Sequence, residues 1–162
     1  MKRFFYFLLF ITCFGLDRIT KILALDGFFN SFNVGNFLTA HLEFNRGISW
    51  GFFHSESQNI FILVSAVIFL TICFLAWNLN IKHKLKNNET IFAEILILSG
   101  AVSNFMDRII YGGVIDFILL SYKGWSWPVF NIADMCVVFG VFILFKESFR
   151  MNELPFFMRK IK

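Results

Sequence analysis

The sequence predicts an all-α membrane protein of four transmembrane helices, with a small β-rich cradle and loop on the outer face. Of its 162 residues, 57% are hydrophobic and 16% are charged, and 25 are Phe. One small soluble core cannot bury that much apolar surface. The apolar residues also gather into four runs, 4–25, 60–77, 91–110 and 132–149. Each run is near the roughly 20 residues that a spanning helix needs. Without repeats or flexible linkers, residues 1–162 are expected to form a single integral membrane domain.

Basic residues predict how the four helices are oriented. Ten of them flank the start of the first run, the 78–90 connection and the end of the fourth run: Lys2, Arg3, Lys82, Lys84, Lys86, Lys146, Arg150, Arg159, Lys160 and Lys162. The other two connections hold only Arg46, Arg108 and Lys123. Because Lys and Arg are enriched in cytoplasmic loops, both termini and residues 78–90 are expected in the cytoplasm. Residues 26–59 and 111–131 are expected to face outward.

The first run has two interpretations. Lys2 and Arg3, followed by an apolar stretch that ends at Leu16, resemble the start of a secretory signal peptide. However, charged residues follow at once, from Asp17 to Lys21, and no small-x-small cleavage site precedes them. We therefore favour a retained first helix.

The first outward segment is expected to contain a small sheet. Apolar and polar residues alternate from Leu38 to Asn45, which is typical of a half-buried strand. Gly47 and Gly51 allow turns after it. The segment is also rich in aromatic residues that could form a surface for an apolar chain, namely Phe28, Phe29, Phe32, Phe37, Phe52 and Phe53.

The third run contains small residues near its outer end. Ser99, Gly100, Ala101 and Ser103 would let neighbouring helices approach closely in lipid. Gly112 and Gly113 then interrupt the helix.

Two aspartates at the edges of apolar segments are the most informative residues of the chain. Asp116 follows the third run, and Asp134 lies in the first turn of the fourth. A carboxylate at mid-bilayer costs about 2.5–3.5 kcal/mol on insertion scales, so it indicates function by default. Two such groups that a returning loop can bring together indicate shared acid and base chemistry.

Other classes of function have little support. The net charge of +4 arises from the cytoplasmic flanks, which favours attraction to anionic membrane lipid over a nucleic-acid partner. Cys13, Cys73 and Cys136 lie inside apolar runs without metal or redox spacing, so we interpret them as small buried residues. His41, His54 and His83 show no ligand spacing. Neither a metal nor another cofactor is expected.

Four motifs together resemble one family. In chain order they are Asp17-Arg18-Ile19-Thr20-Lys21, Asn45-Arg46-Gly47-Ile48-Ser49-Trp50-Gly51, Asn104-Phe105-Met106-Asp107-Arg108 with Val114-Ile115-Asp116-Phe117, and Phe130-Asn131-Ile132-Ala133-Asp134. This order and topology resemble the type II, or lipoprotein, signal peptidases, which are aspartic peptidases of the bacterial cytoplasmic membrane.

The resemblance implies that Asp116 and Asp134 are the catalytic pair of an endopeptidase. It also implies a diacylglyceryl-modified prolipoprotein as substrate, cut on the N-terminal side of the modified cysteine. The residues expected to bind substrate or support the pair are Asn45, Arg46, Asn104, Asp107, Arg108, Asn131, Asp17 and Lys21. Four helices with small-residue contacts are consistent with a monomer in the membrane.

Several of these residues also have structural interpretations. Asp134 could cap the fourth helix together with Asn131, and Asp116 could be a solvated loop residue. Asn104 and Asn131 could orient the pair or only satisfy loop backbone groups. If the two carboxyl groups share one proton, we expect Asp134 to be ionised more often, because the N-terminus of its helix favours negative charge.

The remaining polar residues lie near the outer boundary. Adjacent helical residues point to different faces, so Asp107 and Arg108 are expected to have separate partners and to hold the outer loops. Asp17 and Lys21 are four residues apart and can form an ion pair, which either anchors the helix end or supports the site.

Asn45 and Arg46 are expected to position substrate, by binding peptide backbone and phosphate respectively, although Asn45 could be a plain turn residue.

Two other functions remain open from the sequence alone. A small transporter could use the intramembrane acids as a proton relay. A non-catalytic scaffold could bind a partner through its outer aromatic loop.

Overall fold

The computed structural model describes residues 2–28, 33–34, 37–47, 57–84 and 88–153. Over these residues it has four helices and four short or medium strands. In chain order they are α1 (Lys2–Leu25), β1 (Asn33–Val34), β2 (Leu38–Asn45), α2 (Gln58–Lys84), α3 (Asn88–Tyr111), β3 (Val114–Tyr122), β4 (Trp125–Ser126) and α4 (Ile132–Glu153). The expectation of a mostly helical fold with a small sheet is confirmed.

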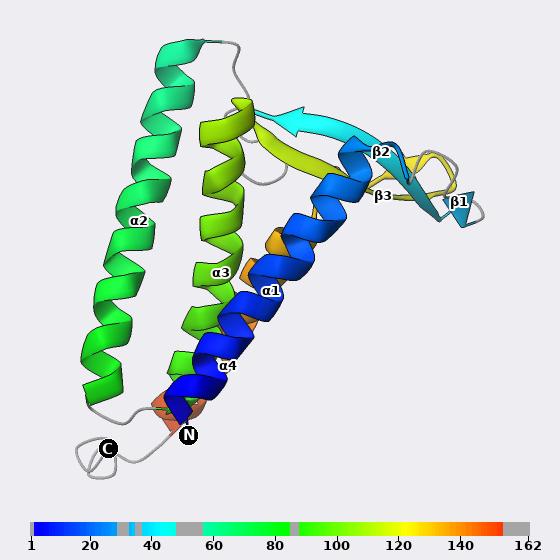
Figure 1. The fold of residues 1–162 in the computed structure, drawn as a ribbon. Helices are drawn as coiled ribbons and strands as arrows, with labels where there is room; N and C mark the ends of the chain where they lie inside the picture. The colour runs from blue at the N-terminus through cyan, green and yellow to red at the C-terminus, as the bar shows by residue number, and fades with distance from the viewer. Residues whose placement is uncertain (1, 29–32, 35–36, 48–56, 85–87, 154–162) are drawn as a thin grey trace.

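Helix α3 is the centre of the bundle, because it contacts α1, α2 and α4. The sheet extends from one end of the bundle, whereas the start of α1 and the end of α4 lie together at the other end (Figure 1). The polar residues of α1, α3 and α4 that are discussed below lie toward the end that carries the sheet.

Glycines allow α3 and α4 to pack closely. A Cβ atom on Gly100 of α3 would collide with the backbone carbonyl oxygen of Ala133 in α4. A Cβ atom on Gly140 of α4 would lie 2.6 Å from the carbonyl oxygen of Ala93 in α3. The predicted close approach through the small residues of the third run is thus present at Gly100.

The four strands pair in the order β1-β2-β3-β4, and all of the pairs are antiparallel. The predicted strand over residues 38–45 coincides with β2, but its predicted alternation of buried and exposed side chains is wrong. Strand β2 also contains a bulge: Ala40 pairs with Ile118 and Glu43 with Asp116, so β2 has one extra residue there. The extra residue changes which side chains share a face.

Two predicted connections differ from the structure. The segment assigned to a cytoplasmic loop, 78–90, is mostly helical, since α2 continues to Lys84 and α3 begins at Asn88. The outward segment 111–131 contains β3, which is not predicted by an alternation of apolar and polar residues because most of its side chains are buried or half-buried on both faces. Trp50, Gly51, His54, the side chain of His83 and the aromatic residues Phe29, Phe32, Phe52 and Phe53 lie outside the described residues.

Apolar and charged side chains are distributed in the reverse of a soluble protein. Large apolar side chains such as Leu70 and Ile109 are 66% and 69% exposed, while Lys21 and Asp17 are 1% and 0% exposed. An outer surface this apolar is typical of contact with lipid. By length and composition, one helix among the described residues qualifies as a membrane span, over Gln58–Asn80 of α2.

Candidate active site

Asp116 and Asp134 line the same cavity, although they come from different elements. Asp116 lies in β3 and Asp134 in the first turn of α4, and the cavity between them and helices α2 and α3 has a volume of about 210 Å³. Asp116 is only 2% exposed, so it is a buried strand residue and not a solvated loop residue.

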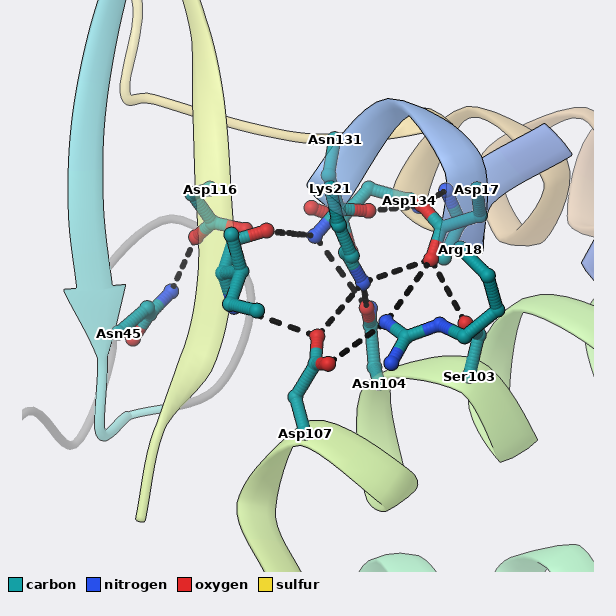
Figure 2. Close-up of polar contacts among 12 residues, drawn as sticks. Asp17, Arg18, Lys21, Asn45, Ser103, Asn104, Asp107, Asp116, Asn131 and Asp134 are labelled. Atoms are coloured by element: carbon teal, nitrogen blue, oxygen red, sulfur yellow. Dashed lines mark hydrogen bonds and ion pairs between the residues drawn. The ribbon is translucent and has the colours of Figure 1, made fainter. Parts of the chain in front are cut away.

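Two amide groups hold the carboxylate of Asp116. Asn45 Nδ2 donates to Asp116 Oδ2 at 3.1 Å, and Asn131 Nδ2 donates to Asp116 Oδ1 at 2.6 Å (Figure 2). Burial and the nearby charge of Asp134 raise the pKa of Asp116 to about 7, while the two amides and Lys21 act in the opposite direction. The proton on Asp116 therefore exchanges near neutral pH.

Asp134 has partners of a similar kind. Asn104 Nδ2 donates to Asp134 Oδ1 at 2.8 Å, and the backbone N–H of Asp134 donates to Asn131 Oδ1 at 2.8 Å. The second bond makes Asn131 the N-cap of α4, as one interpretation expected. Because the amide of the same residue also donates to Asp116, Asn131 links the two aspartates.

A buried cation lies behind this pair. Lys21 Nζ lies 2.7 Å from Asp17 Oδ2, 2.7 Å from Asp107 Oδ2 and 2.7 Å from Asn104 Oδ1. The predicted ion pair between Asp17 and Lys21 is confirmed. By accepting from Lys21, the Asn104 side chain is oriented with its amide N–H toward Asp134.

Asp17 also anchors the start of α4. Its Oδ1 accepts from the backbone N–H of Ala133 at 2.7 Å, and its Oδ2 accepts from Ser103 Oγ at 2.7 Å. A carboxylate at a helix N-terminus is stabilised by the helix dipole. Helices α1, α3 and α4 are thus joined at the residue that precedes Asp134.

Asp107 and Arg108 have separate partners, as predicted. Asp107 Oδ1 accepts from Arg18 Nη2 at 2.6 Å, and Asp107 Oδ2 accepts from the backbone N–H of Ile115 at 3.3 Å. Arg108 instead donates to the backbone carbonyl oxygens of Arg46, at 3.3 Å, and Gly47. Both residues therefore fix the ends of the strands beside Asp116.

Arg46 connects β2 to α2. Its Nη2 donates to Gln58 Oε1 at 2.9 Å, and its guanidinium lies 5.1 Å from the ring centre of Phe61. Asn45 Oδ1 accepts from the backbone N–H of Gly47 at 2.9 Å, so the Asn45 side chain stabilises the turn after β2 and also binds Asp116.

Sequence reasoning missed two members of this network, Arg18 and Ser103. Arg18 was visible as a charge beside an apolar segment, a position that requires a buried partner. Ser103 was interpreted only as a small packing residue. The expectation of buried cysteines is wrong, since Cys73 is exposed and Cys13 and Cys136 are only half-buried. Among the described residues, no group of three or more His, Cys, Asp or Glu side chains is arranged to hold a metal ion.

Comparison with known proteins shows which family the chain resembles. Residues 9–150 match the family described as Signal peptidase (SPase) II. The lipoprotein signal peptidase of Clostridium acetobutylicum is 35% identical over 142 residues, which cover 82% of this chain and 89% of that protein. The lipoprotein signal peptidase of Azoarcus sp. is 33% identical over 144 residues, 86% of this chain and 79% of that protein.

The fold is also similar to that of a solved bacterial membrane enzyme, with a TM-score of 0.70 at 23% identity, over 91% of this chain and 89% of that one. The match to the family extends over most of the chain and includes all of the polar residues described above. The chain belongs to the signal peptidase II family.

Proposed function

We propose that the chain is an aspartic endopeptidase that removes the signal peptide from diacylglyceryl-modified prolipoproteins, with Asp116 and Asp134 as its catalytic pair. The single observation that supports this most strongly is the shared cavity, into which two carboxyl groups from β3 and α4 are brought with amide donors on each. The relatives named lipoprotein signal peptidase supply the substrate class.

The pair divides acid and base roles in hydrolysis. An ionised Asp134 takes a proton from a water molecule, and that water attacks the carbonyl carbon of the scissile peptide bond. A protonated Asp116 donates a hydrogen bond to the carbonyl oxygen and stabilises the negative charge that develops there. The tetrahedral intermediate then collapses, and the nitrogen leaves with a proton supplied by the pair.

The raised pKa of Asp116 supports this assignment of roles. With its pKa at about 7, Asp116 can hold a proton at neutral pH and still exchange it during the reaction. Asp134 lies in the first turn of α4, where the helix dipole favours the carboxylate form.

The remaining polar residues are positioning residues in this proposal. Lys21 orients Asn104, Asn104 orients Asp134, and Asn131 spans the pair. Asp17 fixes the start of α4. Arg108 and Asp107 hold the strand ends, so that Asp116 faces the cavity.

We place the protein in a bacterial cytoplasmic membrane as one four-span domain with cytoplasmic termini and the sheet outside. The basic flanks support this orientation, and the exposed apolar side chains of all four helices support the membrane location. Apolar side chains of α2, α3 and α4 form part of the cavity lining, which suits the signal peptide, and the acyl chains of the substrate remain in lipid.

Purified protein in detergent micelles with a lipid-modified peptide tests the proposal. Asp116→Asn and Asp134→Asn should each lower the cleavage rate by at least about 100-fold, because each removes one proton-transfer group. Asp26→Asn, at an exposed aspartate beyond α1, is the matched control and should cleave normally. Cleavage at the wild-type rate by either Asn variant of the pair would exclude the mechanism.

A proton-relay transporter is the alternative, and membership of a peptidase family disfavours it. That function would tolerate Asp116→Glu and would produce proton flux in liposomes without substrate. Proteolysis that depends on both aspartates, with no such flux, distinguishes the two.

A further inference from the structure

A second pocket opens on the sheet side of Asp116. It has a volume of about 470 Å³, within the range of ligand sites, and His41, Glu43 and Ser126 are part of its lining. It shares Asn45 and Asp116 with the cavity between the helices, so these two residues form a common wall.

The two pockets differ in chemistry. The cavity between the helices is lined largely by apolar side chains, such as Ile68, Leu75 and Val137, whereas the sheet-side pocket is lined by several polar ones. A prolipoprotein has the same asymmetry, because an apolar signal segment precedes the cleavage point and a polar mature segment follows it. A substrate chain that crosses Asp116 in one direction would place its apolar segment in the cavity between the helices and its polar segment in the sheet-side pocket. The opposite direction would mismatch both.

The register of the sheet brings a carboxylate close to the cleavage position. Glu43 of β2 pairs directly with Asp116 of β3, and side chains of such pairs lie on the same face with Cβ atoms about 5 Å apart. This match depends on the bulge between Ala40 and Glu43, since without the extra residue the side chain of position 43 would point to the opposite face.

The charged residues that line this pocket favour a basic side chain over an acidic one. Its lining contains the carboxyl groups of Glu43 and Asp116, the imidazole of His41 and, among the residues that the structure describes, neither Lys nor Arg. Because the proposed mechanism keeps Asp116 protonated, Glu43 carries the charge that a bound segment meets. Glu43 is exposed, so it is already hydrated and is free to meet an arriving side chain.

We propose that the sheet-side pocket receives the first residues after the cleavage point, and that Glu43 makes the enzyme select a basic over an acidic side chain there. This inference rests on the proposed function, because it assigns a subsite to the same substrate. Glu43 is a specificity-determining residue in it and takes no part in proton transfer.

Three lipid-modified peptides test the inference, identical except for Lys, Ser or Glu directly after the modified cysteine. The measurement is the ratio of kcat/KM for the Lys peptide to that for the Glu peptide. Wild type should prefer Lys by about five-fold, the upper range for an exposed ion pair, and the preference should decline in high salt. Glu43→Gln should bring the ratio near one, and Glu43→Lys should invert it. Asp26→Lys, a charge reversal at an exposed residue outside the pocket, should keep the wild-type ratio.

Failure of the inference and failure of the proposed function give different results. If wild type cleaves none of the three peptides, the proposed function is wrong. If wild type and Glu43→Gln cleave the Ser peptide and have equal Lys-to-Glu ratios, the function stands and the subsite assignment is wrong. Should Glu43→Lys lose all activity, the nearly isosteric Glu43→Gln still decides, because its ratio either falls toward one or does not.

Discussion

The hydrogen bond from Asn45 to Asp116 provides a direct test of how the site sets its proton affinity. Asn45 Nδ2 lies 3.1 Å from Asp116 Oδ2 and stabilises the ionised carboxylate. A hydrogen bond to a charged group contributes about 1.5–3 kcal/mol, and one pKa unit corresponds to about 1.4 kcal/mol. Asn45→Ala should therefore raise the pKa of Asp116 from about 7 by roughly one to two further units.

The shift should be visible in the pH profile of kcat/KM on a lipid-modified peptide. The proposed mechanism uses the protonated form of Asp116, so activity should fall as the pH rises through the pKa of this carboxyl group. For wild type the decrease should be about ten-fold between pH 6 and pH 8. Asn45→Ala should have a lower plateau, because Asp116 is less well oriented, but the plateau should extend to about pH 8.

Asn80→Ala is the matched control, since Asn80 is exposed on α2 and donates to the backbone carbonyl oxygen of Ala76. Its profile should coincide with that of wild type. An alkaline limb of Asn45→Ala at the same pH as wild type, or at a lower one, would refute the electrostatic reasoning about Asp116.

Two further predictions concern the residues behind the pair. Lys21→Met removes one of the two cations that the buried Asp17 and Asp107 share, the other being Arg18, and should destabilise the protein by about 3 kcal/mol, seen as a lower thermal unfolding midpoint in detergent. Lys123→Met, at an exposed turn, should have little effect, and equal midpoints for Lys21→Met and wild type would contradict the buried network. Gly100→Ala forces the start of α4 away from α3 and should lower kcat by displacing Asp134, whereas Gly15→Ala has open space at its Cβ and should keep wild-type kcat; an unchanged rate in Gly100→Ala would show that the contact is not needed.

The helices and the polar residues were predictable because each depends on a local signal. Long apolar runs locate helices, and a charge inside such a run must have a partner, so the spacing of Asp17 and Lys21 predicts the ion pair that the structure contains. Asp116 and Asp134 stand out in the sequence for a similar reason, because each is an acidic residue at the edge of an apolar segment.

The sheet was less predictable because its side chains are not divided into a solvent-exposed face and a buried face. Strand β3 is buried on both faces over its first half, so its sequence does not alternate and Asp116 is predicted only to lie in the outward segment 111–131. The bulge in β2 also depends on pairing with a strand about 70 residues away, and no local pattern encodes it. The same applies to Ser103, whose partner Asp17 lies on another helix.

The long sequence separation within the buried network has a consequence for biosynthesis. Translation produces α1 first, and Arg18 meets Asp107 only after another 89 residues have been made. Until then α1 holds the Asp17–Lys21 ion pair and Arg18, and so would carry one net positive charge toward the hydrocarbon. The helix should therefore wait near the lipid headgroups and reach its final depth together with α3, so that a nascent chain truncated before α3 would remain incompletely inserted.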